Sequence, residues 1–101
     1  MKKQDRYFYP AIFVFLEALI DGGILAGLPR AQAEQLALQT LYGSAKLALE
    51  SGETAATLKG RVTSPGGTTI EGIQTLEQGA FRALVMAAVR EASRRSRELG
   101  R

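Results

Sequence analysis

Apolar residues recur along this chain at the spacing of a helix rather than that of a strand. The first apolar segment is hydrophobic on nearly every side, whereas the second and the last each have one apolar stripe. Glycine, proline and threonine stand at several of the boundaries between segments. The sequence therefore predicts an all-α protein of about five helices and no strands, over residues 9–20, 29–50, 54–59, 69–77 and 81–99.

The apolar stripes identify the faces that we expect to be packed. In the second helix small residues also leave room for another helix to approach closely. The stripe of the second helix consists of Ala33, Leu36, Ala37, Thr40, Leu41, Ser44 and Leu47. The face of the last helix consists of Phe81, Leu84, Val85, Ala88, Val89 and Ala92.

Local signals at the helix ends support these boundaries. Pro10 is tolerated in the first turn of the first helix, and Asp21-Gly22-Gly23 is expected to end it. Thr54 is suited to cap the short third helix. Gly79 is expected to stop the fourth helix.

The first helix raises the question of a membrane, because Lys2 and Lys3 precede the apolar run 11–16. The run is too short to span a bilayer, and Glu17 and Asp21 interrupt it in a way that is not typical of a signal peptide. We therefore expect no membrane association and interpret the segment as a helix that a partner subunit covers.

Composition narrows the chemistry. The 101 residues suit one domain whose small core would gain from oligomerisation. Cysteine and histidine are both absent, which excludes disulfides and thiolate metal sites and removes the commonest metal ligand and general base. We expect no metal and no catalytic residue in this chain, and a cytoplasmic location. The segment 22–27 has the wrong glycine spacing for a dinucleotide site and follows a helical run, so we expect no bound cofactor.

The end of the chain is basic and accounts for the net charge of +3. Charge alone would allow a nucleic-acid contact, and the affinity of such a contact would depend steeply on salt concentration. However, Glu91 is placed to pair with Arg94 and Arg95, and Glu98 with Arg94, and cations favour a helix C-terminus. We interpret this region as a solvated face and expect no nucleic-acid partner.

The segment 64–69, Ser-Pro-Gly-Gly-Thr-Thr, has the features of an anion-binding helix entrance. Adjacent glycines permit a tight turn with an exposed backbone, and Thr68 with Glu71 forms a capping-box pattern. Free N–H groups and the helix dipole would favour a carboxylate or phosphate there. Taken alone, such a pattern more often serves only to cap a helix than to bind a ligand.

Longer matches surround this segment. The chain resembles pyrroline-5-carboxylate reductases over nearly its whole length. The matching stretches are Val62-Thr63-Ser64-Pro65-Gly66-Gly67-Thr68-Thr69-Ile70 and the segments 17–23, 27–30, 36–40, 43–46, 76–82 and 95–99. The resemblance implies an intertwined dimeric helical bundle, like the C-terminal domain of the 6-phosphogluconate dehydrogenase type. It assigns residues 10–101 to the dimerisation domain of such a reductase and leaves residues 1–9 as an altered segment.

The resemblance also implies a function. The complete enzymes reduce 1-pyrroline-5-carboxylate to L-proline with NAD(P)H, and a Rossmann domain that precedes the helical domain holds this cofactor. We find no Rossmann pattern in these residues and expect this chain to be without that domain. The chain alone is therefore expected to be catalytically inert. By position, Ser64 and the N–H groups of Gly67 and Thr68 would hold the substrate carboxylate, and Thr69 would face the ring nitrogen. The implied substrate-binding residues are Ser64, Gly66, Gly67, Thr68 and Thr69.

Two departures from the family pattern leave an alternative open. Tyr7, Phe8 and Tyr9 stand where the family has small residues before its first helix, and Gly60 stands where an acidic residue is common. We interpret the aromatic cluster as a cover for exposed core rather than a ligand site. The implied partners are a second copy, with a higher oligomer left open, a separate Rossmann domain and a small carboxylate such as proline. The alternative is a stand-alone dimeric scaffold module without enzymatic role.

Overall fold

The computed structural model describes residues 6–63 and 67–100, and they form five helices with no strand among them. The predicted all-α fold is therefore confirmed. The fold class follows from local signals, since every predicted helix is found within a few residues of its expected limits. The helices are α1 Tyr9–Leu25, α2 Arg30–Ser51, α3 Ala55–Val62, α4 Thr68–Gln78 and α5 Phe81–Glu98.

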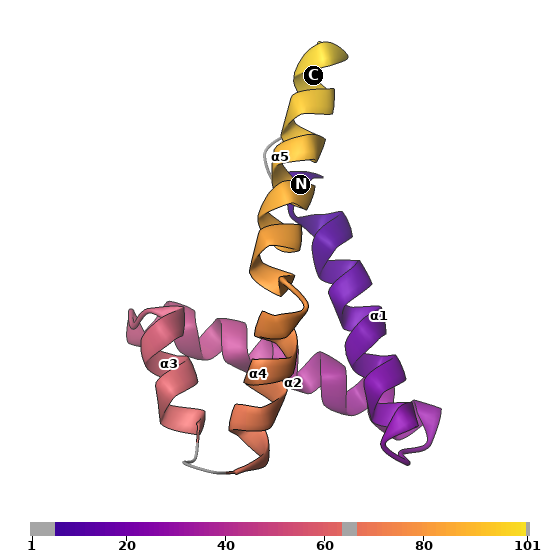
Figure 1. Ribbon diagram of the computed structural model, residues 1–101, viewed down its shortest axis with the longest axis vertical. Helices are drawn as coiled ribbons and strands as arrows, with labels where there is room; N and C mark the ends of the chain where they lie inside the picture. The colour runs from indigo at the N-terminus through magenta and orange to yellow at the C-terminus, as the bar shows by residue number, and fades with distance from the viewer. Residues whose placement is uncertain (1–5, 64–66, 101) are drawn as a thin grey trace.

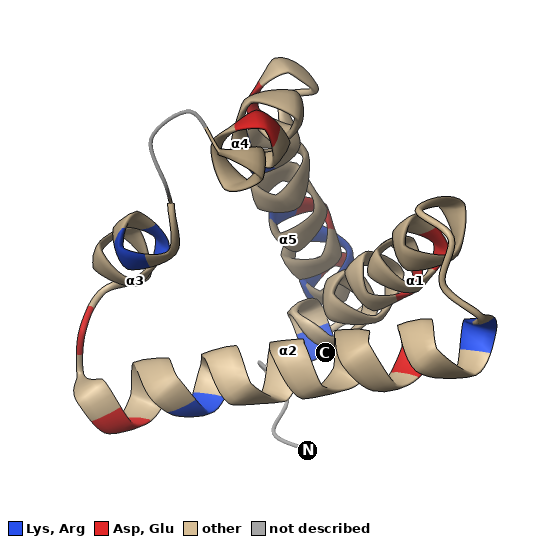
Figure 2. Cartoon of the chain, turned by 90° about the horizontal axis from the view of Figure 1, so that it is seen from below, with Lys and Arg blue, Asp and Glu red and all other residues tan. Residues whose placement is uncertain are grey.

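The helices form an open arrangement rather than a closed bundle (Figure 1). Helix α2 is a base on which α1 packs, and α3 stands at the other end of α2 (Figure 2). Helices α4 and α5 follow one another along the long axis, and α5 runs beside the first half of α1 in the opposite direction. The ring centroids of Phe15 and Phe81 lie 5.7 Å apart where α1 meets the start of α5.

The end of α1 differs from the prediction. The helix does not stop at Asp21-Gly22-Gly23 but continues to Leu25. A Cβ atom built on Gly23 would lie only 3.1 Å from the Cβ of Ala33, so this glycine serves the close approach of α1 to α2. The chain turns instead at Gly27, whose φ of 111° disfavours any side chain.

Very little of this chain is buried within one copy. Among the described residues only Ala33 and Ala37 are buried, at 2% and 7% exposure, and both lie on the predicted stripe of α2. The chain exposes 8034 Å², whereas a compact protein of this mass exposes about 5,600 Å². Its radius of gyration is 15.6 Å, against about 13 Å for a compact domain of this length. The apolar faces of α1 and α5 therefore remain largely open.

Candidate functional site

The entrance to α4 is built on glycine. Gly67 is the N-cap, with an extended backbone at φ −91° and ψ −179°, and no side chain within residues 6–63 and 67–100 caps the helix. Thr68 is already the first helical residue, so the predicted capping box is wrong. The physical reason is that the capping position falls one residue earlier, on a residue that has no side chain to accept an N–H bond.

Among the described residues, no side chain accepts a capping hydrogen bond from the first N–H groups of α4. The first turn of any helix has N–H groups without intrahelical acceptors, and the dipole makes this end partly positive. Gly67 and Thr69 are half-buried and Thr68 is exposed. These three predicted residues are consecutive at the entrance, whereas Ser64 and Gly66 lie outside the described residues. The described part of the site can therefore offer backbone donors and two hydroxyl groups to a small anion.

Helix α3 precedes this entrance in the chain. Thr54 caps it as predicted, since its Oγ1 accepts a hydrogen bond of 3.1 Å from the N–H of Thr57. The helix runs to Val62, three residues beyond the predicted end. At that end the hydroxyl of Thr63 donates to the carbonyl oxygen of Lys59 at 2.7 Å. Both ends of α3 thus have local hydrogen bonds.

An open apolar groove of about 400 Å³ separates the beginnings of α1 and α5. Val14 on α1 and Leu84 on α5 line it with side chains that remain 65% and 64% exposed. Its walls carry no charged residue, which makes the groove a candidate protein-binding surface rather than a site for a charged metabolite. The groove is lined by Pro10, Ala11, Val14, Phe15, Ala18, Phe81, Leu84, Val85 and Ala88.

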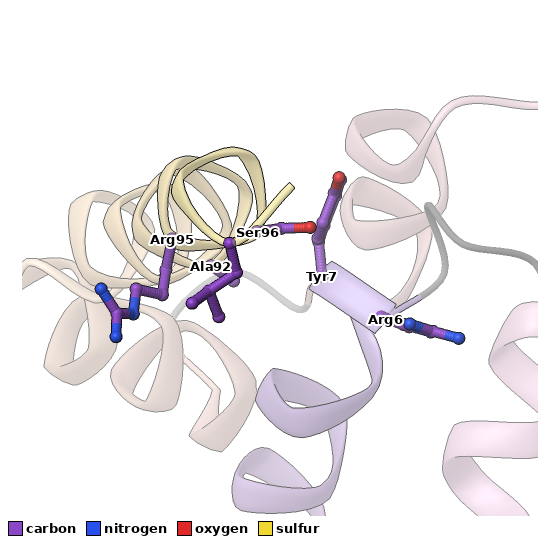
Figure 3. Close-up of a pocket in the computed structure, with 6 residues that line it drawn as sticks. Arg6, Tyr7, Ala92, Arg95 and Ser96 are labelled. Atoms are coloured by element: carbon purple, nitrogen blue, oxygen red, sulfur yellow. The ribbon is translucent and has the colours of Figure 1, made fainter. Parts of the chain in front are cut away.

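The aromatic segment before α1 lies at the upper part of α5. A pocket of about 240 Å³ between this segment and α5 (Figure 3) is lined by Arg6, Tyr7, Ala92, Arg95, Ser96 and Leu99. Ser96 points toward Tyr7, while the guanidinium groups of Arg6 and Arg95 point away in opposite directions. The rings of Tyr9 and Phe13 stack at 6.4 Å. The interpretation as a cover for apolar surface therefore suits Tyr7, which is half-buried, whereas Phe8 and Tyr9 remain 55% and 41% exposed.

The basic end of α5 is partly neutralised by its own acids. Arg94 donates to Glu91 at 2.9 Å and also pairs with Glu98, as predicted. Arg95 pairs with Glu98 at 3.2 Å instead of with Glu91. These contacts are those of a solvated helix face.

Acidic clusters and long apolar helices bear on two further kinds of site, a metal centre and a membrane span, within residues 6–63 and 67–100. No group of three or more acidic residues there is arranged to hold a metal ion. None of the helices in this part of the chain is long and apolar enough to span a membrane.

Comparison with known proteins identifies one family. The model of the pyrroline-5-carboxylate reductase dimerisation family matches residues 8–99. The pyrroline-5-carboxylate reductase of Synechocystis is 56% identical over 90 residues, which are 89% of this chain and 34% of that protein. The enzyme of Arabidopsis thaliana is 54% identical over 88 residues, 87% of this chain and 32% of that protein.

Solved structures agree with the sequence comparison. The NADP-bound pyrroline carboxylate reductase of Plasmodium falciparum superposes with a TM-score of 0.86 and 35% identity, over 100% of this chain and 45% of that one. The reductase of Coxiella burnetii gives a TM-score of 0.87 and 34% identity, over 98% of this chain and 40% of that one. The chain spans about a third of the length of the curated relatives it matches.

Proposed function

The chain belongs to the pyrroline-5-carboxylate reductase dimerisation family, and from this premise we propose that it is the dimerisation and substrate-binding domain of such a reductase. The observation that supports the proposal is the entrance of α4, where Gly67 is the N-cap and Thr68 and Thr69 begin the helix. In the resemblance these three residues would hold the substrate. In this proposal the chain forms a homodimer, binds a small carboxylate and does not catalyse the reaction alone.

The unburied surface supports the homodimer. The chain exposes about 2,400 Å² more than a compact protein of its mass. If both copies buried this excess, the total buried area would fall in the range of obligate homodimer interfaces, about 2,000 to 5,000 Å² or more. The apolar groove between α1 and α5 offers a surface of the required kind. Each copy would cover the exposed apolar side chains of the other.

The entrance supports carboxylate binding. The N–H groups of Gly67 and Thr68 would donate to the carboxylate of 1-pyrroline-5-carboxylate or L-proline, with Ser64 added by position in the motif. The hydroxyl of Thr69 would face the ring nitrogen. Charge-assisted hydrogen bonds from a fixed backbone orient a substrate as well as bind it.

The nicotinamide cofactor does not fit the described residues. They form no strand and hence no strand–turn–helix unit of the kind that holds a dinucleotide. In the complete enzyme NAD(P)H would supply the hydride from a separate Rossmann domain. The part of this chain would be to bind and orient the substrate.

Calorimetric titration of L-proline into the homodimer tests the binding. We expect saturable binding whose affinity falls about tenfold or more in Thr69→Ala, because a hydrogen bond to a charged ligand is lost. Thr75→Ala is the matched control, since it removes a hydroxyl from the same helix that donates to the carbonyl of Glu71 at 3.0 Å. An unchanged affinity in Thr69→Ala would remove the assignment.

The second candidate is a stand-alone dimeric scaffold module. The bulky segment at Tyr7 to Tyr9 favours it, because small residues there would let substrate and cofactor approach. The same titration separates the two functions. A well-folded dimer that binds no proline, with or without an added Rossmann domain, would support the scaffold.

A further inference from the structure

Helix α3 is the least supported helix in the described part of the chain. Substantial contacts join α1 to α2, α4 to α5 and α1 to α5, and α3 takes part in none of these pairs. It stands apart from α4 and α5 in both views (Figures 1 and 2). Yet the chain leaves α3 directly for the entrance of α4. Four residues, 63–66, separate the end of α3 from Gly67, so the reach of the chain makes the orientation of α3 limit where that entrance can lie.

Most hydrogen bonds at the corner between α2 and α3 are local. Gly52 turns the chain in the left-handed region, with φ 70°, and its N–H donates to the carbonyl of Ala48 at 3.1 Å. The N–H of Glu53 donates to the Oγ of Ser51 at 3.1 Å. These bonds shape the corner, but they do not reach the far end of α3.

One side-chain pair does reach that far end. Arg61, in the last turn of α3, donates through Nη2 to Oε1 of Glu53, which precedes the capping residue. Side chains on a helix lean toward its N-terminus, so an arginine can span the two turns between them. The carboxylate stands at the positive end of the dipole and the guanidinium at the negative end. The pair therefore links the last turn of α3 to the residue that precedes its N-cap, at the corner with α2.

Glu53 is also the most enclosed acid of the ion pairs in the described residues. Its side chain is 30% exposed, whereas those of Glu34, Glu77, Glu91 and Glu98 are 46% to 54% exposed. Its Oε2 is buried and has no hydrogen-bond partner among the described residues. Loss of Arg61 would leave an enclosed carboxylate without its cation. This pair should therefore contribute more to stability than a fully exposed pair does.

We propose that the ion pair between Glu53 and Arg61 positions the entrance of α4 by fixing the orientation of α3. Both are positioning residues, since they act through Gly67 to Thr69 and would not touch the ligand. The consequence for ligand affinity rests on the proposed function. The consequence for the conformation of the entrance does not.

Amide NMR of the homodimer without ligand tests the conformational part. In Arg61→Gln we expect amide exchange at Leu58 to Thr63 to accelerate roughly threefold to tenfold, and the resonances of Gly67 and Thr69 to shift. Amides of α1 and α2 should be unchanged. Arg61→Lys should restore the spectrum, because it keeps the charge. Arg30→Gln, which breaks the exposed 4.0 Å pair with Glu34 in α2, is the control.

Three outcomes would overturn the proposal. Unchanged resonances of Gly67 and Thr69 would mean that the pair stabilises α3 alone. A uniform acceleration that includes α1 and α2 would mean a general loss of stability. Failure of Arg61→Lys to restore the spectrum would remove the charge as the cause.

Titration of L-proline into the same variants tests the functional part. We expect Arg61→Gln to weaken binding and Arg61→Lys to restore it. Absence of proline binding in the unmodified chain would defeat the proposed function, while the NMR result would still decide the positioning role.

Discussion

Two consecutive glycines in α1 have different surroundings, although the sequence gives no reason to distinguish them. A Cβ on Gly22 would meet nothing within 4 Å. A Cβ on Gly23 would lie 3.1 Å from the Cβ of Ala33, the most buried residue of α2, and 3.5 Å from Leu28. Only one of the two glycines is therefore required by packing.

The same substitution should consequently have opposite effects at these positions. Gly22→Ala should raise the free energy of unfolding by about 0.5 to 1 kcal/mol, because alanine is the better helix former. Gly23→Ala should lower it by about 1 kcal/mol or more, because α1 must move away from α2. Urea denaturation at one fixed protein concentration measures both. A stabilised Gly23→Ala would contradict the close approach.

The capping positions show how one residue of register changes the chemistry of a site. Thr54 is an N-cap and uses its hydroxyl to close its own helix. Thr68 lies one residue inside α4 and caps nothing, because Gly67 holds the capping position. The first threonine stabilises its helix, and the second has no capping role; in the proposed function its helix entrance would receive the ligand.

At the level of elements, the junction between α4 and α5 contains a strained residue. Ala80 has φ 59° and ψ 37°, and it is the non-glycine residue with positive φ in the described chain. Gly79 stops α4 as predicted, yet the left-handed turn that redirects the chain into α5 falls on alanine. The left-handed conformation costs an L-residue about 1 kcal/mol.

Replacing this alanine should stabilise the protein. Ala80→Gly should raise the free energy of unfolding by about 0.5 to 1 kcal/mol, because glycine adopts the left-handed region without strain. Ala83→Gly, inside α5, is the matched control and should lower it by about 1 kcal/mol. Thermal unfolding of both variants checks the difference in sign. Equal losses in the two would show that Ala80 is not strained.

At the level of the whole molecule, the apolar side chains of α1 and α5 are left for the second copy of the proposed homodimer to cover. Within one copy α1 and α5 leave their facing side chains largely exposed, and the described residues bury only two alanines. Such a protein is expected to gain most of its stability from association, so its unfolding midpoint should rise with protein concentration.

A charge in the apolar groove should weaken that association. Val14→Asp places a carboxylate on the groove wall, and we expect the dimer to dissociate at least about tenfold more readily, with loss of helix content in the monomer. Glu50→Lys, at an exposed polar position near the end of α2, is the control and should leave association unchanged. Sedimentation at micromolar concentration measures both. A stable dimer of Val14→Asp would exclude the groove from the interface.

The sequence by itself determined the number, type and approximate limits of the helices, because periodicity and caps such as Thr54 act within a few residues. It also carried the family motif at residues 62–70. The tertiary structure decided where α1 ends and which residue opens α4. Packing of Gly23 on Ala33 carries α1 past a local stop signal, since contact with a distant helix outweighs a preference of about 1 kcal/mol. The structure alone also showed that Arg61 reaches Glu53, because a contact between residues eight apart depends on the conformations of two long side chains.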